Sequence, residues 1–194
     1  CSFTSVSEQL TPSTLMQWLN RGMCIGVDAV TDRGGIVNKF TGDGMLAVFG
    51  APVSKGPGVD AAHAVAAALA IQDQISTLNE TLMLEGQPPL RMRIGIHSGP
   101  VLTGSLGSSQ RLEYAVIGDT VNCASRLEGL QKNRHRDMVR VLISGETMDL
   151  LEALPPDATS EAWGSIQVKG RQEPLEVIEL RNTPPKQPEA RRHR

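Results

Sequence analysis

Aromatic residues are scarce in this sequence: Phe, Trp and Tyr make up 3% of its 194 residues. Such a set provides few side chains that could stack on the bases of single-stranded nucleic acid. It also means that the core must consist mainly of aliphatic side chains. No apolar run approaches the ~20 residues that cross a bilayer as a helix. The three cysteines, Cys1, Cys24 and Cys123, lack metal-ligand spacing. They favour free thiols in a reducing, cytoplasmic compartment over a disulfide framework.

The remaining composition is typical of one folded domain. Hydrophobic residues make up 40%, charged residues 21%, and the net charge is −2. These values exclude a disordered chain and an overall basic nucleic-acid-binding protein. The segment 182–194 is basic, contains three prolines and lacks large apolar residues. We therefore predict a domain over residues 1–181 and a disordered basic tail over 182–194.

Helical and strand periods alternate along the domain, which predicts an α+β sandwich with helices on one face of a largely antiparallel sheet. The Thr11-Pro12 pair is typical of a helix start. Helices are expected near 12–31, 59–83, 120–130 and 146–151. Strands are expected near 36–39, 45–49, 90–96, 101–106, 139–144, 166–169 and 176–180. Consecutive strands are expected to pair as hairpins in three places: 36–39 with 45–49, 90–96 with 101–106, and 166–169 with 176–180.

The turn after the strand at 36–39 contains Asp43 between two glycines. Aspartates in such turns commonly hydrogen-bond their own backbone, and a lone carboxylate does not make a divalent metal site. Lys39 precedes this turn, and a solvated lysine at a sheet edge is the ordinary reading. By themselves, these residues therefore leave turn chemistry and metal binding both open.

Asn122 and Arg126 are four residues apart, hence on one face of the helix expected at 120–130. An amide and a guanidinium on the first turns of a helix can hold a charged oxygen in a transition state, but an ordinary polar helix face fits the same spacing. Asp119 or Thr120 is expected to cap this helix. A basic turn around Lys169 is a weaker signal.

Taken together and in this order, these segments resemble the catalytic domain of class III nucleotidyl cyclases of the bacterial adenylate cyclase type. The similarity extends from about residue 1 to 180, and several ordered motifs are more specific than any one. It implies a ferredoxin-like α+β fold whose first strand would precede Cys1 and is missing from this chain. The matching segments are Cys1–Glu8, Lys39–Asp43, Arg93–Gly99, Glu113–Glu128 and Val168–Gly170.

The resemblance implies an adenylate cyclase, in which the ribose 3′-hydroxyl of ATP attacks the α-phosphate to give 3′,5′-cyclic AMP and pyrophosphate. Two divalent ions, Mg²⁺ or Mn²⁺, are held in the family by two aspartates. Asp43 corresponds to the second, and the first would lie two residues before Cys1. The resemblance also implies a homodimer with two shared sites. Asp43 of one chain would serve one site, while Lys39, Asn122 and Arg126 of that chain would serve the other.

By the same resemblance, Asn122 orients the ribose and Arg126 stabilises the charge developing at the α-phosphate. Lys169 would bind the triphosphate. Backbone amides at Phe3 and Thr4, where a helix opens, would face the triphosphate as well, since helix N-termini suit anions.

The base-recognition residues are Lys39 and the position of Ala115. Lys39 corresponds to the lysine that donates to adenine N1, whereas the N1–H of guanine is itself a donor. Ala115 stands where adenylate cyclases carry Asp or Thr, and it accepts no hydrogen bond through its side chain. A backbone carbonyl near Val116 is the candidate replacement. We expect ATP to be preferred, with discrimination weakened by one hydrogen bond, about 1 kcal/mol.

Two alternatives remain open. The chain could be an inactive cyclase-like module for dimerisation or nucleotide sensing, or a guanylate cyclase. A diguanylate cyclase is disfavoured because its Gly-Gly-Asp/Glu-Glu-Phe turn is absent. Nucleic-acid binding rests only on the tail and the basic cluster Lys132–Arg136, and none is expected. An upstream sensory or membrane segment of the same polypeptide is expected, so the cytoplasmic domain could be tethered to a membrane.

Overall fold

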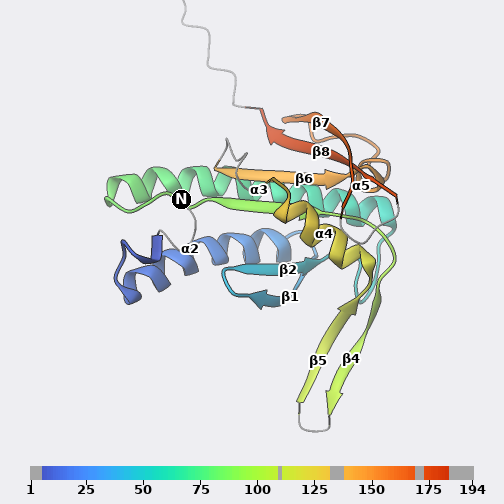
Figure 1. The fold of residues 1–194 in the computed structure, drawn as a ribbon, viewed down its shortest axis with the longest axis horizontal. Helices are drawn as coiled ribbons and strands as arrows, with labels where there is room; N and C mark the ends of the chain where they lie inside the picture. The colour runs from blue at the N-terminus through green and yellow to red at the C-terminus, as the bar shows by residue number, and fades with distance from the viewer. Residues whose placement is uncertain (1–5, 109–110, 132–137, 169–172, 184–194) are drawn as a thin grey trace, which may run out of the picture.

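The computed structural model describes residues 6–108, 111–131, 138–168 and 173–183. Predictions made for Phe3, Thr4, Lys169, the basic cluster at 132–136 and the tail from 184 lie outside these residues. The described chain forms an α+β fold, which confirms the predicted class (Figure 1).

Two long helices pack against each other, and the longer of them also contacts the main sheet (Figure 1). Helix α2 (Pro12–Thr31) begins where the sequence predicted, and the Thr11 hydroxyl accepts a hydrogen bond from the Thr14 amide at 3.3 Å. Helix α3 (Pro57–Leu84) follows, and α4 (Asp119–Gly129) and α5 (Gly145–Met148) are shorter. None of the helices in the described part of the chain combines the length and apolarity needed to span a membrane.

The strands in the described part of the chain form three separate sheets. Strands β1 (Ile36–Thr41) and β2 (Gly44–Val48) make one antiparallel hairpin, and β4 (Leu102–Ser108) and β5 (Arg111–Ile117) make another. The four-stranded sheet has the order β3-β6-β8-β7, in which β3 and β6 are parallel and the other pairs antiparallel. Its strands are β3 (Met92–Ile96), β6 (Val139–Ser144), β8 (Leu175–Asn182) and β7 (Ala158–Ile166).

The predicted hairpin of β3 with the strand near 101–106 is wrong. The segment Ser98–Pro100 directs β4 away from the sheet, and the Thr120 hydroxyl donates to the Pro100 carbonyl at 2.7 Å. Strand β4 instead pairs with β5, a strand that was not predicted. Strand β3 pairs in parallel with β6, and α4 lies in the connection between them, as parallel strands require.

The C-terminal strands also differ from the prediction. The penultimate strand covers Ala158–Ile166 instead of residues 166–169. Strand β8 extends to Asn182, one residue beyond the predicted domain limit. The side-chain amide of Asn182 donates to the Leu69 carbonyl at 2.8 Å and to the Asp73 carboxylate at 2.7 Å. These contacts attach the strand end to α3.

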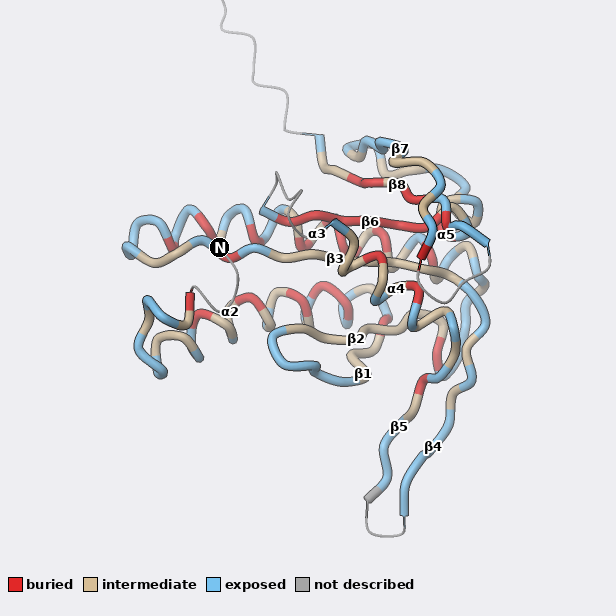
Figure 2. The backbone as a smooth tube through the Cα atoms, viewed as in Figure 1, coloured by how far each residue is buried: buried red, intermediate tan, exposed pale blue. Residues whose placement is uncertain are grey.

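Helices cover both faces of the main sheet, so the prediction of a single covered face is wrong. All six residues of β6 are buried, as the red segment in Figure 2 shows. Val141 and Ile143 belong to the core cluster that contains residues of α2 and α3, whereas Leu142 packs in a second cluster with Leu127 of α4. A strand buried on both faces is a near-continuous hydrophobic run, which is the pattern of residues 139–144.

Candidate active site

The β1–β2 hairpin presents Lys39 and Asp43. Thr41 pairs with Gly44, so Gly42 and Asp43 form a two-residue turn, with Gly42 in the left-handed region at φ 65°. Both Lys39 and Asp43 are exposed, and both line a large cavity beside the hairpin. The predicted hairpin is therefore confirmed, and it brings these two side chains to one side of the domain.

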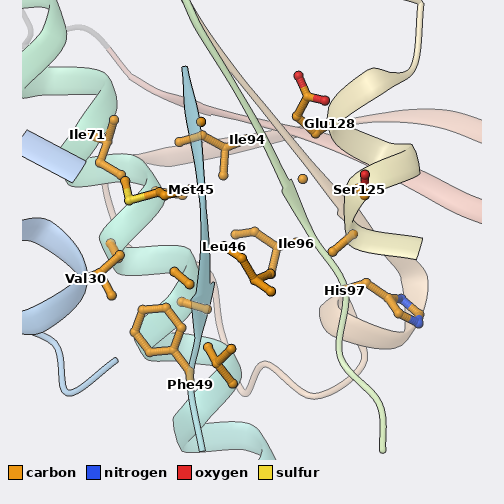
Figure 3. Close-up of a pocket in the computed structure, with 18 of the residues that line it drawn as sticks. Val30, Met45, Leu46, Phe49, Ile71, Ile94, Ile96, His97, Ser125 and Glu128 are labelled. Carbon is orange, nitrogen blue, oxygen red and sulfur yellow. The ribbon is translucent and has the colours of Figure 1, made fainter. Parts of the chain in front are cut away.

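That cavity has a volume of about 1,610 Å³ and separates β2 from β3. Leu46 of β2 and Ile94 and Ile96 of β3 are among its apolar lining residues (Figure 3). In the described chain, β2 and β3 each have a hydrogen-bonded neighbour along one edge only. The cavity therefore lies between two strand edges that have no hydrogen-bonded neighbour in the described chain.

Helix α4 carries Asn122 and Arg126 on its outer side. One residue further along the chain from each, Cys123 and Leu127 are fully buried, which fixes the orientation of the helix. Asn122 is exposed. The Nη1 atom of Arg126 is shielded from solvent, yet it has no hydrogen-bond partner among the described residues. The same atom forms an ion pair with Asp119 at 3.6 Å, which is longer than a hydrogen bond.

The start of α4 differs from the prediction. Neither Asp119 nor Thr120 is the N-cap; Gly118 holds that position, with no side-chain cap. Asp119 lies in the first turn of the helix, where a negative charge favours the positive end of the helix dipole.

Two arginines hold the C-terminal half of α4 against the sheet. Arg93 of β3 pairs with Glu128 at 2.7 Å. Arg140 of β6 donates to the Gln131 carbonyl at 3.0 Å and to the carbonyls of Glu128 and Leu130. Burial lowers the pKa of the Arg140 guanidinium, and the positive charge of Arg93 acts in the same direction. Arg140 thereby bonds one carbonyl of the last helical turn and the two carbonyls that follow the helix, which anchors the element that bears Asn122 and Arg126.

Gly95 of β3 allows α4 to approach closely, because a Cβ there would overlap the Ala124 carbonyl and the Glu128 amide. We expect Gly95→Ala to lower the free energy of unfolding by about 1–3 kcal/mol, since backbone atoms yield less readily than side chains. Gly104→Ala on β4 is the matched control, because a Cβ there meets nothing within 4 Å. Urea unfolding measures both variants. Equal stability of the two would contradict the close approach.

Strand β5 brings the predicted base-recognition positions next to β1. Ala115 is half-buried and Val116 is buried. The Asn38 side-chain amide donates to the Tyr114 carbonyl at 2.6 Å, which joins the two hairpins. Sequence reasoning missed both β5 and Asn38. The run from Tyr114 to Ile117 is rich in strand-forming residues and could have indicated the strand, whereas nothing local indicated the partner of Asn38.

A divalent metal centre is not complete in the described residues. They contain no group of three or more His, Cys, Asp or Glu side chains that could hold an ion. Asp43 alone supplies one exposed carboxylate, and hard divalent cations need more oxygen ligands. The described donors therefore do not fit a metal pair unless further ligands come from elsewhere.

Residues 1–179 match the family model described as "Adenylate and Guanylate cyclase catalytic domain". The chain is 33% identical over 182 residues to Adenylate cyclase 1 of Rhizobium meliloti, covering 92% of this chain and 26% of that protein. It is 30% identical over 183 residues to Adenylate cyclase of Anabaena cylindrica, covering 92% of this chain and 34% of that protein. The chain thus spans about a third or less of these two relatives.

Solved structures agree with this match. The adenylyl cyclase CyaB from P. aeruginosa superposes with a TM-score of 0.82 at 29% identity, covering 96% of this chain and 91% of that one. The guanylyl cyclase Cya2 gives 0.78 at 31% identity, with 95% and 89% covered. From its sequence match and its architecture, the chain belongs to the adenylate and guanylate cyclase catalytic domain family.

Proposed function

We propose that this domain converts ATP to 3′,5′-cyclic AMP and pyrophosphate. The bond from O3′ to the α-phosphorus forms, the bond from that phosphorus to the pyrophosphate oxygen breaks, and the hydroxyl proton is released. The observation that carries the proposal is Arg126, whose Nη1 is shielded from solvent without a hydrogen-bond partner among the described residues. Asp119 approaches this atom only to 3.6 Å, beyond hydrogen-bond distance, so a substrate phosphate oxygen within hydrogen-bond distance would satisfy the donor.

Asn122 and Arg126 have separate tasks in this proposal. The exposed amide of Asn122 orients the ribose, which places the 3′-hydroxyl in line with the α-phosphorus. The Arg126 guanidinium neutralises the charge that develops on the α-phosphate oxygens. Because α4 is anchored through Arg93 and Arg140, Arg126 needs little rearrangement to act.

ATP is the proposed substrate because Lys39 can donate to adenine N1. The carbonyl of Tyr114 points toward β1, where Asn38 bonds it. Backbone groups of alternate strand residues share an edge, so the Val116 carbonyl points the same way and can accept from the adenine amine. Two relatives of this chain are named adenylate cyclases.

GTP is the second candidate, and a specific observation favours it. Ala115 offers no side-chain acceptor to the exocyclic amine of adenine, and the guanylyl cyclase Cya2 has a closely similar structure. Product analysis with both nucleotides decides between them. Faster formation of cyclic GMP than of cyclic AMP would assign the second activity.

The missing metal ligands are proposed to come from an upstream segment of the same polypeptide. An extended strand in the gap between β2 and β3 would lie beside the Asp43 turn, since both Asp43 and the two strands line that cavity. Asp43 would then hold Mg²⁺ or Mn²⁺ together with a carboxylate of that strand. When bound, such ions lower the pKa of the 3′-hydroxyl and neutralise phosphate charge. A sensory or membrane-tethering region further upstream is part of the same proposal.

A homodimer is proposed to complete the sites. The β4–β5 hairpin projects from the body of the domain (Figure 1). Its exposed side chains include Leu102, Leu106 and Leu112, which are 73%, 62% and 66% exposed. Apolar side chains clustered on a projecting arm are typical of an interface, and a twofold interface would bring Asp43 of one copy toward Asn122 and Arg126 of the other.

Complementation between two inactive variants tests the shared site. Chains with Asp43→Ala and chains with Asn122→Ala should each be inactive alone. When they are mixed and allowed to exchange, about half of the dimers are heterodimers with one intact site, so about one quarter of wild-type activity should return. Cyclic nucleotide formation in the presence of Mn²⁺ is the measurement.

A mixture that stays inactive after subunit exchange has been demonstrated would contradict the shared site. The control for the exchange procedure mixes Asp43→Ala chains with Asp43→Ala chains that carry a second tag. This mixture should recover no activity.

A further inference from the structure

Asn38 occupies a bulge in β1. Val37 pairs with Ala47 and Lys39 pairs with Leu46, so Asn38 is the extra residue in the ladder. A bulge changes the direction of the side chain at that position and interrupts the pairing of the strand. Here the bulge lies directly before Lys39, the proposed base-recognition lysine.

The Asn38 side chain spans the space between two hairpins. Its Nδ2 donates to the Tyr114 carbonyl of β5 at 2.6 Å. Strands β1 and β2 form one sheet and β4 and β5 another, and no backbone ladder joins the two sheets in the described residues. The bond thus connects the residue preceding Lys39 to the residue preceding Ala115.

We propose that Asn38 is a positioning residue that sets the selectivity for the nucleobase, an inference that rests on the proposed cyclase function. Lys39 follows Asn38 on β1, and the Val116 carbonyl shares with the Tyr114 carbonyl the edge of β5 that faces β1. Adenine presents an acceptor at N1 beside a donor amine, whereas guanine presents a donor at N1 beside the O6 acceptor. To distinguish adenine from guanine by these two neighbouring groups, the lysine and the carbonyl must lie at a fixed separation. The Asn38 bond holds the two strands at that separation.

The Asn38 bond matters most when the side chain at position 115 accepts no hydrogen bond from the base. With alanine at 115, the preference for adenine depends on Lys39 and a backbone carbonyl, and neither can adjust independently of its strand. A loss of the Asn38 bond should therefore weaken the recognition of ATP more than that of GTP. A bond that only stiffens the fold would instead lower turnover of both nucleotides by the same factor.

The test compares kcat/KM for ATP and for GTP in purified protein with Mn²⁺. We expect Asn38→Ala to lower the ATP-to-GTP ratio by about three- to tenfold, the effect of one hydrogen bond. Asn38→Asp keeps the shape of the side chain but lacks the donor, so it should lower the ratio at least as much. Asn20→Ala, at an exposed position on α2, should leave the ratio unchanged.

An unchanged ratio in both Asn38 variants, or equal losses with both nucleotides, would overturn the inference. Failure of the proposed function shows separately, as wild-type protein that forms no cyclic nucleotide. In that case, displacement of a fluorescent ATP analogue by ATP and by GTP provides the same ratio without turnover. The inference is overturned if the two nucleotides displace the analogue from the variants as they do from the wild type, or if neither nucleotide displaces it.

Discussion

Replacing Asp43 with alanine should reduce cyclic nucleotide formation by about 100-fold or more, because a metal ligand supports several kcal/mol of transition-state stabilisation. The fold should survive the change. Asp43 is exposed in the hairpin turn, and the left-handed residue of that turn is Gly42, so alanine at 43 meets no backbone strain. The thermal midpoint and the dimer measured by sedimentation should stay at their wild-type values.

Asp28→Ala is the matched control for this variant. Asp28 is another exposed aspartate, located near the C-terminal end of α2 and not among the residues that line the large cavity. Its removal should leave activity unchanged. Wild-type turnover by Asp43→Ala would contradict the proposed metal role, and Asp43 would then be only a residue of the hairpin turn.

Replacing Arg126 with alanine should lower kcat by about 100-fold while KM changes much less. The reason is that the guanidinium contact strengthens as charge develops at the α-phosphate, so its loss falls on the transition state. Alanine is also the best helix former, so α4 should persist. Steady-state kinetics with ATP measure the effect, and circular dichroism checks the helix.

Arg21→Ala serves as the comparison for Arg126. Arg21 forms an exposed pair with Glu85 at 2.6 Å, and such surface pairs contribute about 0–1 kcal/mol to stability. Its loss should leave kcat unchanged. If Arg126→Ala raised KM and left kcat unchanged, Arg126 would contribute to substrate binding only. The proposal that it stabilises the transition state would then be wrong.

Much of the local structure could be predicted from the sequence. The cap at Thr11 and the proline after it determine where α2 begins, and the glycines around Asp43 determine the turn of the first hairpin. Both features depend on contacts within a few residues, which is why sequence reasoning reached them. The order and spacing of the motifs were also sufficient to identify the family.

Long-range pairing could not be predicted. Strand β3 was expected beside its sequence neighbour, but it pairs with β6, because the chain turns away after Ile96 and α4 covers the resulting sheet. The covering of both sheet faces follows from that connection. In the proposed site, local spacing placed Asn122 and Arg126 on one helix face, but it gave no information on whether Arg126 has a partner.

By itself, then, the sequence determined the residue types, their helix faces and turns, and the family of the domain. Three features arise from packing alone: the bond from Asn38 that bridges two hairpins, the contacts of Arg140 and Gly95 with α4, and the cavity lined by both β2 and β3. The physical reason is distance along the chain. Caps and turns are set by neighbouring backbone atoms, whereas these contacts form only after segments far apart in sequence have packed together.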